Sequence, residues 1–192
     1  METSADITPL KSTANVTDDR EALPKFWIAA YTRPKSERKA ASQLSANLGI
    51  DTYVPVQTVT KQWSDRKKKI DIVVIPMVIF AEVSSPSHLL SIKKHPLILK
   101  ILTMPGQREA ARIPYSQISQ LRFMLDRSAA PVEFIPHSFN VSDPIRVVRG
   151  QLAGLTGTVD RTPDGHTYII ISIDLLGGAK AEVSQTDIEL IK

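Results

Sequence analysis

The pattern of apolar residues changes near residue 143, and this change constrains the fold more than any other feature of the sequence. Before it, runs with strand-like alternation are interspersed with runs at helical spacing. After it, only short strand-like runs remain, and six of the chain's eight glycines lie among them. Short strands separated by glycine and aspartate turns are typical of a small barrel. The sequence therefore predicts two domains of different architecture.

The first domain is predicted to follow the order β-α-β-β-(β)-α-β-α. Its helices are expected at Ser36–Leu48, Pro86–Lys94 and Tyr115–Leu125, with Ser36 capping the first helix and Gly49 ending it. The apolar run Ile72–Ala81 is interpreted as buried strand. This order favours an α+β fold, a ferredoxin-like α/β sandwich with helices on one face of a mainly antiparallel sheet, followed by a five-stranded barrel.

These patterns divide the chain into four segments. Polar, aperiodic residues at the start predict a flexible leader, and two prolines without periodicity predict a linker between the domains. We expect a leader over 1–24, the α/β domain over 25–126, the linker over 127–142 and the barrel over 143–192.

Charge is distributed unevenly between these segments. Residues 24–140 contain 17 basic and eight acidic side chains, whereas residues 141–192 contain five basic and seven acidic ones. The first domain would therefore attract a polyanion and the barrel would not. From charge alone, a basic surface that only confers solubility is an equally good interpretation.

No pattern for catalysis or for a cofactor is present. The chain has no cysteine, its four histidines lack metal-binding spacing, and the glycine-rich segment at 150–157 lacks the lysine of a phosphate-binding loop. The apolar runs are too short to span a membrane. We expect a cytoplasmic protein that is not an enzyme and binds no cofactor, no metal and no membrane.

The segment DPIRVVRGQLAGLTGTVDR, residues 143–161, resembles the KOW motif of NusG-like factors and some ribosomal proteins. A hydrophobic and basic strand is followed by closely spaced glycines and a second hydrophobic strand. The motif residues are Val148, Gly150, Gly154 and Gly157.

Two upstream segments resemble the amino-terminal (NGN) domain of NusG. They are WIAAYTRPKSERKAASQL and IPMVIFAEV, although Ile75, Met77 and Val78 replace the usual aromatic residue, glycine or asparagine, and tyrosine. The turn at 31–35 and the strand TYVPV are most similar to the UpxY/RfaH-type specialised antiterminators of Bacteroidetes. The resemblance implies a monomeric transcription elongation or antitermination factor, acting in a specific operon such as one for surface polysaccharides.

The same resemblance implies the contacts with bacterial RNA polymerase. An apolar patch would bind the clamp helices, and the start of the second helix would bind the gate loop. The matching residues are Tyr31, Ile75, Val78 and Phe80 for the patch, and His88 and Leu89 for the helix. Strand alternation leaves open whether Ile75, Val78 and Phe80 are exposed contacts or core.

Family members of this kind also read the non-template DNA strand through a basic helix and turn. The matching residues are Arg33, Lys35, Arg38, Lys39, Gln43 and Asn47. For each lysine, a solvated helix face is the more common role. The lysines 67–69 would reach upstream DNA or only keep a hairpin soluble. Partners implied for the KOW domain are a ribosomal protein or Rho. The alternative is a KOW-containing ribosome-associated or RNA-binding protein that does not bind polymerase.

Overall fold

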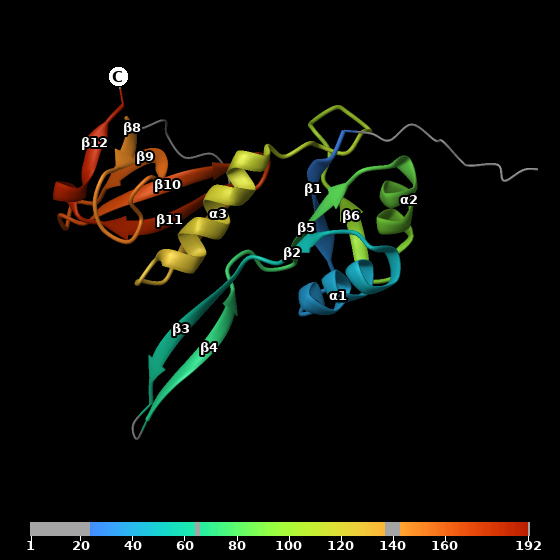
Figure 1. The fold of residues 1–192 in the computed structure, drawn as a ribbon, viewed down its shortest axis with the longest axis horizontal. Helices are drawn as coiled ribbons and strands as arrows, with labels where there is room; N and C mark the ends of the chain where they lie inside the picture. Colours follow the sequence, from blue (N-terminus) through green and yellow to red (C-terminus); the bar gives the residue numbers. More distant parts are fainter. Residues whose placement is uncertain (1–23, 64–65, 137–142, 192) are drawn as a thin grey trace, which may run out of the picture.

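The computed structural model describes residues 24–63, 66–136 and 143–191. Two sheets lie at opposite ends of an elongated molecule, and a two-stranded hairpin projects between them (Figure 1). The predicted leader falls almost entirely outside the described residues. None of the helices in the described segments is long and apolar enough to cross a membrane.

The first sheet is antiparallel and has four strands in the order β2-β5-β1-β6. The expected alternation of strands and helices along the chain is found. The order in the sheet differs from the order in the chain, since β5 lies between β2 and β1 although two further strands separate β2 from β5 in the chain. The strands are β1 (Phe26–Thr32), β2 (Thr52–Tyr53), β5 (Val78–Val83) and β6 (Ile98–Ile101).

Strand alternation gives this sheet two apolar faces, since neighbouring side chains of a strand point to opposite sides. Ile28 and Ile79 belong to the face that packs under α1 (Glu37–Leu48) and α2 (Pro86–Lys94). Trp27 and Phe80 belong to the opposite face, which shares a core with α3 (Tyr115–Arg127). The expectation that all helices cover one face is therefore wrong for α3, whose apolar residues pack on the opposite face of the sheet.

The first helix begins and ends for different reasons. Gly49 ends it as predicted: its φ of 63° is left-handed, and its N–H donates to the carbonyls of Leu44 and Ser45. Ser36 occupies the N-cap position, but its side chain makes no capping hydrogen bond. Glu37 is instead buried, and its Oε1 accepts a hydrogen bond of 2.7 Å from the Met77 N–H. The helix start is thus tied to the turn before β5.

The hairpin consists of β3 (Val56–Gln62) and β4 (Lys67–Val73), which pair only with each other. It divides the apolar run Ile72–Ala81 into two structures. Ile72 is exposed on the hairpin, whereas Val78 to Ala81 are buried in β5. The run was expected to be buried as one or two strands; it forms parts of two, because the chain turns at Pro76 and Met77, and the expected burial is wrong for Ile72.

The second sheet has six strands in the order β12-β8-β9-β10-β11-β7. Five of them were expected, but β7 (Glu133–Pro136) lies within the predicted linker and pairs with β11. The segment 127–142 is therefore partly sheet. We call this the C-terminal sheet; its other strands are β8 (Pro144–Val147), β9 (Thr156–Arg161), β10 (Thr167–Ile173), β11 (Gly177–Val183) and β12 (Ile188–Leu190).

Helix α3 joins the two sheets. Ile118, Leu121 and Met124 are buried as part of one apolar cluster that extends from the first sheet into the C-terminal sheet. In Figure 1 the helix runs alongside β10 and β11, and its first residues lie near β1. The two sheets therefore share a core through α3.

We predict that Gly157→Ala destabilises the C-terminal sheet by about 3 kcal/mol, because a Cβ would overpack the sheet. That Cβ would stand 2.3 Å from the carbonyl oxygen of Ile170, which belongs to the backbone of β10. Gly165→Ala is the control: its φ of 84° is strained for alanine, but a Cβ there meets nothing within 4 Å, so we expect about 1 kcal/mol. Urea unfolding measures both. Equal losses would contradict the close approach at Gly157.

Candidate functional site

The predicted apolar patch lies on the sheet face that is opposite α1 and α2. Tyr31 pairs with Val78 across β1 and β5, and the ring of Phe80 stacks on that of Tyr53 with 6.0 Å between centroids. Ile75, Val78 and Phe80 are at most 2% exposed. The expected exposed cluster is therefore absent in this arrangement, because α3 and the core that it shares with the C-terminal sheet cover these three residues.

Tyr31 is half-buried and differs from its neighbours in reaching an open hollow. The Lys100 ammonium lies 5.2 Å from the centre of its ring. The hollow has a volume of about 340 Å³ and is bounded by the loop after β6, which includes Met104, and by Leu175 in the turn between β10 and β11. A phenol at the rim of a hollow presents both ring surface and a hydroxyl to a partner.

The C-terminal sheet lies against α3 next to this hollow. Gln117 accepts a hydrogen bond of 2.9 Å from the Asp174 N–H, and the Gln120 amide donates to the Thr156 hydroxyl at 3.0 Å. Asp174 immediately precedes Leu175, which lines the hollow. The position of this sheet therefore determines how much of the Tyr31 surface is accessible.

The other predicted contact residues lie at the start of α2. His88 and Leu89 are half-buried, and the Ser85 hydroxyl accepts a hydrogen bond from the His88 N–H as the helix cap. Leu89 lines a groove of about 670 Å³ that contains the exposed Leu90 and Leu99. Four cations border the groove, namely Lys93, Lys100, Arg108 and Arg112.

The edge strand β6 lies between the groove and the Tyr31 hollow. Lys100, Ile101 and Thr103 line both of them. The groove is on the α2 side of the sheet, whereas Tyr31 belongs to the opposite side. Two concave surfaces of different orientation are thus held at a fixed separation by one sheet edge.

The predicted nucleic-acid residues lie on α1 and on the turn that precedes it. Lys39, Gln43 and Asn47 recur every four residues and therefore share one helix face, on which Lys39 and Asn47 are exposed and Gln43 is half-buried. Lys35 is exposed in the turn, where its φ is 57°. Arg33 is also exposed, but its Nε donates to the Pro96 carbonyl at 3.1 Å.

Arg38 differs from the rest of this set because it has an acidic partner. Its guanidinium pairs with the Asp71 carboxylate of β4 at 3.1 Å, and the Thr58 hydroxyl donates to the same carboxylate at 2.7 Å. Hydrogen bonds from Thr58 and then Arg38 hold the pKa of Asp71 below its ordinary value. Arg38 therefore connects α1 to the hairpin, and Lys35 and Lys39 are better placed to bind phosphate.

Burial affects the neighbouring His95. Desolvation lowers the pKa of His95, and its Nδ1 accepts a hydrogen bond of 3.2 Å from the Leu97 N–H. Both observations favour a neutral ring near Arg33. At neutral pH this histidine adds no positive charge to the basic surface.

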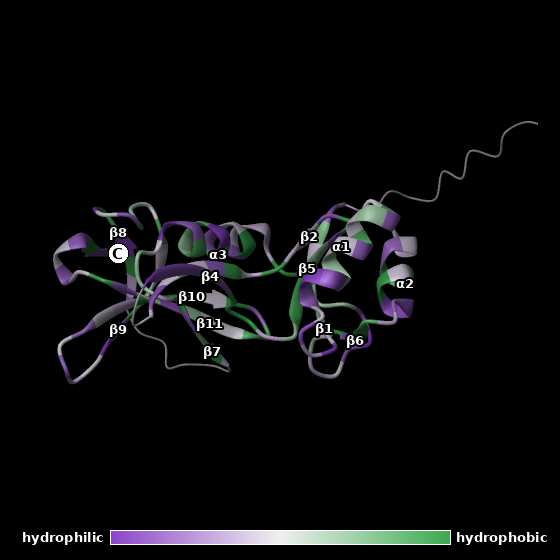
Figure 2. Cartoon of the chain, turned by 90° about the horizontal axis from the view of Figure 1, so that it is seen from below, coloured by the Kyte–Doolittle hydropathy of each residue, from purple (hydrophilic) through white to green (hydrophobic). Residues whose placement is uncertain are grey.

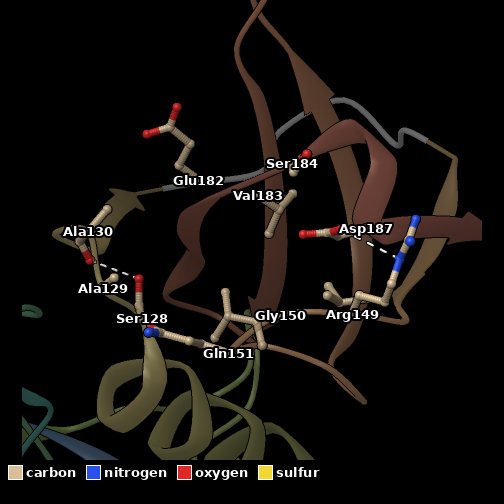
Figure 3. A pocket seen from close by; sticks show the side chains of 12 residues that line it. Ser128, Ala129, Ala130, Arg149, Gly150, Gln151, Glu182, Val183, Ser184 and Asp187 are labelled. Atoms are coloured by element: carbon tan, nitrogen blue, oxygen red, sulfur yellow. Dashed lines mark hydrogen bonds and ion pairs between the residues drawn. The ribbon is translucent and has the colours of Figure 1, made fainter.

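The predicted KOW residues lie in the turn between β8 and β9 and at the start of β9. Val148 is exposed directly after β8, Gly150 and Gly154 have positive φ within the turn, and Gly157 lies in β9. Beside the turn is a hollow of about 410 Å³, drawn in Figure 3, which Ser128 and Glu182 also line. Arg149 and Asp187 form an ion pair at 3.7 Å on its rim.

Comparison with known families gives a match over residues 25–122, to the family described as "NusG: Transcription termination factor nusG". The chain belongs to the NusG family. Proteins of this family are transcription factors and not enzymes. The matched segment contains the first sheet, the hairpin, α1, α2 and the first half of α3.

Comparison with solved structures gives matches of low sequence identity. "Domain interaction in Thermotoga maritima NusG" is 15% identical, covers 88% of this chain and 98% of that one, and has a TM-score of 0.48. "Crystal Structure of MjSpt4:Spt5 complex conformation A" is 11% identical, with coverages of 86% and 98% and a TM-score of 0.28. No curated protein matches this chain.

At one position of the NusG-family segment, Met77, the chain departs from the family pattern but keeps the backbone conformation that the pattern predicts. Its φ is 61°, in the left-handed region that glycine and asparagine adopt at little energetic cost. Glycine or asparagine is usual at this position in the sequences that the chain resembles. The backbone groups of Met77 are both used, by Glu37 and by the Thr32 N–H. The turn is therefore kept although its residue has changed.

Sequence reasoning missed Gln57, which connects the hairpin of the NusG-family segment to the chain after α3. Its amide donates to the carbonyls of Ser128 and Ala130 at 3.4 and 2.9 Å, and its Oε1 accepts from the Val132 N–H at 2.8 Å. The side chain is buried. A glutamine within a strand is normally exposed, so nothing in the sequence marks this one.

We predict that Gln57→Ala lowers the free energy of unfolding by about 3 kcal/mol, because it leaves the buried Val132 N–H without its partner and removes the bonds to the half-buried Ser128 and Ala130 carbonyls. Gln62→Ala is the matched control, since Gln62 lies on the same strand but is exposed. Urea unfolding gives the stabilities, and hydrogen exchange at the Val132 N–H reports the lost bond directly. If that N–H keeps its protection in Gln57→Ala, the hydrogen bonds of Gln57 are not what holds residues 128–132 in place.

Proposed function

We propose that this NusG-family protein is an elongation and antitermination factor that binds RNA polymerase through residues 25–126. The observation that carries the proposal is the pair of concave surfaces on either side of β6, one lined by Tyr31 and the other by Leu89, the residue after His88. These are the positions implied for the clamp helices and the gate loop. A rigid sheet edge that offers two surfaces suits a ligand that bridges two polymerase elements.

Within this proposal the predicted patch residues have two roles. Tyr31, at the rim of its hollow, makes the contact with the clamp helices. Val78 is its cross-strand partner and is buried together with Ile75 and Phe80, so these three support the contact surface from below. Half-buried aromatic anchors over a packed base are the usual form of an energetic hot spot.

Bridging explains how such a factor suppresses pausing and termination. A ligand shifts a conformational equilibrium only by the difference in its affinity for the two states. Two contact surfaces fixed on one sheet edge can be occupied together only when the clamp and the gate loop are at a matching distance. The factor then stabilises the closed, elongating polymerase at the expense of the paused one.

The basic face of α1 supplies recruitment to a specific operon, such as one for surface polysaccharides. Lys35 and Lys39 bind phosphates of the non-template strand, and Gln43 and Asn47, one and two turns further on, contact base edges. The C-terminal sheet, with the glycine-rich turn and Val148 exposed, acts as a KOW domain that docks a ribosomal protein or Rho.

We expect Tyr31→Ala to reduce binding to core RNA polymerase at least 10-fold in a co-purification or interferometry assay, because a hot-spot aromatic is lost. Tyr168→Ala is a close control. Tyr168 is also half-buried and has a lysine ammonium, that of Lys180, 4.0 Å from its ring centre, but it lies in the C-terminal sheet. Full binding by Tyr31→Ala would show that Tyr31 does not anchor the contact with polymerase. Failure of the wild-type protein to bind polymerase would reject the function in favour of a ribosome-associated or RNA-binding role.

For the α1 face, changing Lys35 and Lys39 to Ala should weaken recruitment to complexes paused with an exposed non-template strand. Each lost phosphate contact should reduce the slope of log K against log salt by about 0.7, the value for single strands. Lys94→Ala, an exposed lysine at the end of α2, should leave the slope unchanged. The same slope in both proteins would show that these lysines are merely solvated.

A further inference from the structure

The hairpin β3–β4 carries surface features that neither the polymerase contacts nor the α1 face require. Its strands have seven residues each and extend about 23 Å at the usual rise per residue. They project away from both sheets in Figure 1 and pair only with each other. A lone two-stranded ribbon is at best marginally stable, so its persistence depends on anchors at its base.

Two polar anchors fix the base of the hairpin. Gln57 binds the chain after α3, and Asp71 binds Arg38 of α1 and Thr58. The far end is closed by a hydrogen bond of 2.8 Å from the Trp63 N–H to the Arg66 carbonyl. The hairpin is thus an arm that is anchored at its base and whose strands pair only with each other.

Positive charge is concentrated on this outer half. The register places Lys61 directly opposite Lys68, and like charges in that position destabilise a strand pair. Among the described hairpin residues the one carboxylate is Asp71, which is already paired with Arg38. Figure 2 shows the outer half of β4 as hydrophilic. The charge therefore opposes the stability of the hairpin and suits an anionic ligand.

An exposed tryptophan lies among these cations. Trp63 is 60% exposed, whereas the other tryptophan, Trp27, is 3% exposed in the core. If the lysines only kept the hairpin soluble, an exposed indole at the same end would work against them. A flat aromatic surface between cations is instead the arrangement that binds a strand with unpaired bases, by stacking on the base and neutralising the phosphates.

The lysines are distributed on both faces of the ribbon. Lys67 and Lys69 alternate with Lys68, so they point to the face that Asp71 shares, next to Arg38 and α1. Lys61 and Lys68 occupy the other face. A strand that crosses the end of the hairpin would therefore meet cations before and after Trp63, and it could continue along the hairpin towards the basic face of α1.

We propose that the end of hairpin β3–β4 is a binding site for single-stranded nucleic acid, in which Trp63 stacks on an unpaired base and the hairpin lysines hold the neighbouring phosphates. Duplex DNA offers only phosphates to this surface, since its bases are already stacked. An anionic membrane would require several apolar residues at the tip, and the described tip has one aromatic residue among polar ones.

The test uses the full chain without polymerase. Labelled oligonucleotides of about 12 nucleotides, within the usual range of single-strand site sizes, are titrated as oligo-dT, as oligo-U and as a duplex of the same length. Fluorescence anisotropy gives the affinities, and quenching of tryptophan fluorescence reports Trp63 because Trp27 is buried. We expect both single strands to bind and to quench; their relative affinity distinguishes DNA from RNA as the preferred ligand.

Trp63→Ala should weaken strand binding about 10-fold and abolish the quenching, as expected for one lost stacking contact. Trp63→Phe should lose less, because phenylalanine still stacks. Lys61→Gln combined with Lys68→Gln should reduce the salt slope by about 1.4. Tyr115→Ala, an exposed aromatic residue on α3, and Lys94→Gln are the matched controls and should bind as wild type.

Several outcomes would overturn the proposal. They are unchanged affinity in Trp63→Ala, a duplex that binds as tightly as the single strands without quenching, or binding to phosphatidylserine vesicles in place of oligonucleotides. A urea midpoint equal to that of wild type shows that Trp63→Ala is folded. Polymerase binding is measured separately and should be retained in Trp63→Ala, so failure of this site and failure of the proposed function are distinguishable.

Discussion

The packing of α3 is the constraint on which the rest of the structure depends. Gln120 and Arg122 are two residues apart, about 200° around a helix, and they contact different sheets. Gln120 binds Thr156 of the C-terminal sheet, whereas the Arg122 guanidinium lies over the rings of Trp27 and Tyr53 in the first part of the chain. Leu121 and Met124 are buried in the cluster that includes residues of both sheets. Separating the helix from either sheet would therefore expose apolar surface. Its shared core is the reason that the predicted patch is closed and that Tyr31 remains at its rim.

Three polar contacts give this apolar arrangement a definite geometry. Glu37 holds the turn before β5, Asp71 holds α1 to the hairpin, and Gln57 holds the hairpin to the chain after α3. Apolar packing alone is non-directional, so it would tolerate small rotations between these elements. The hydrogen bonds of Glu37 and Gln57 do not, because their partners are backbone groups that a misplaced side chain would leave unsatisfied. The surfaces proposed for polymerase and for nucleic acid are consequently displayed at fixed positions relative to one another.

Much of the fold could be predicted because it follows from local patterns. The glycine after Leu48 identifies the end of a helix, and the spacing of Ile118, Leu121 and Leu125 identifies a helix. What failed depends on distant partners. Whether Val78 and Phe80 are exposed depends on where α3 lies, and β7 exists only because β11 offers an edge to Glu133–Pro136. Arg38 has the pattern of a phosphate ligand, but the residue that occupies it, Asp71, is 33 positions away.

The hydrogen bonds of Gln57 have a consequence for evolution and for engineering. Because this side chain belongs to the hairpin and its three partners belong to the chain that leads into the C-terminal sheet, the two ends of the molecule are not independent modules. A chimera that joins this C-terminal sheet to the first part of another family member inherits the backbone of 128–132 without the amide that satisfies it. Exchange of parts between relatives should therefore succeed most readily when the hairpin and the segment after α3 are transferred together, as one inherited unit.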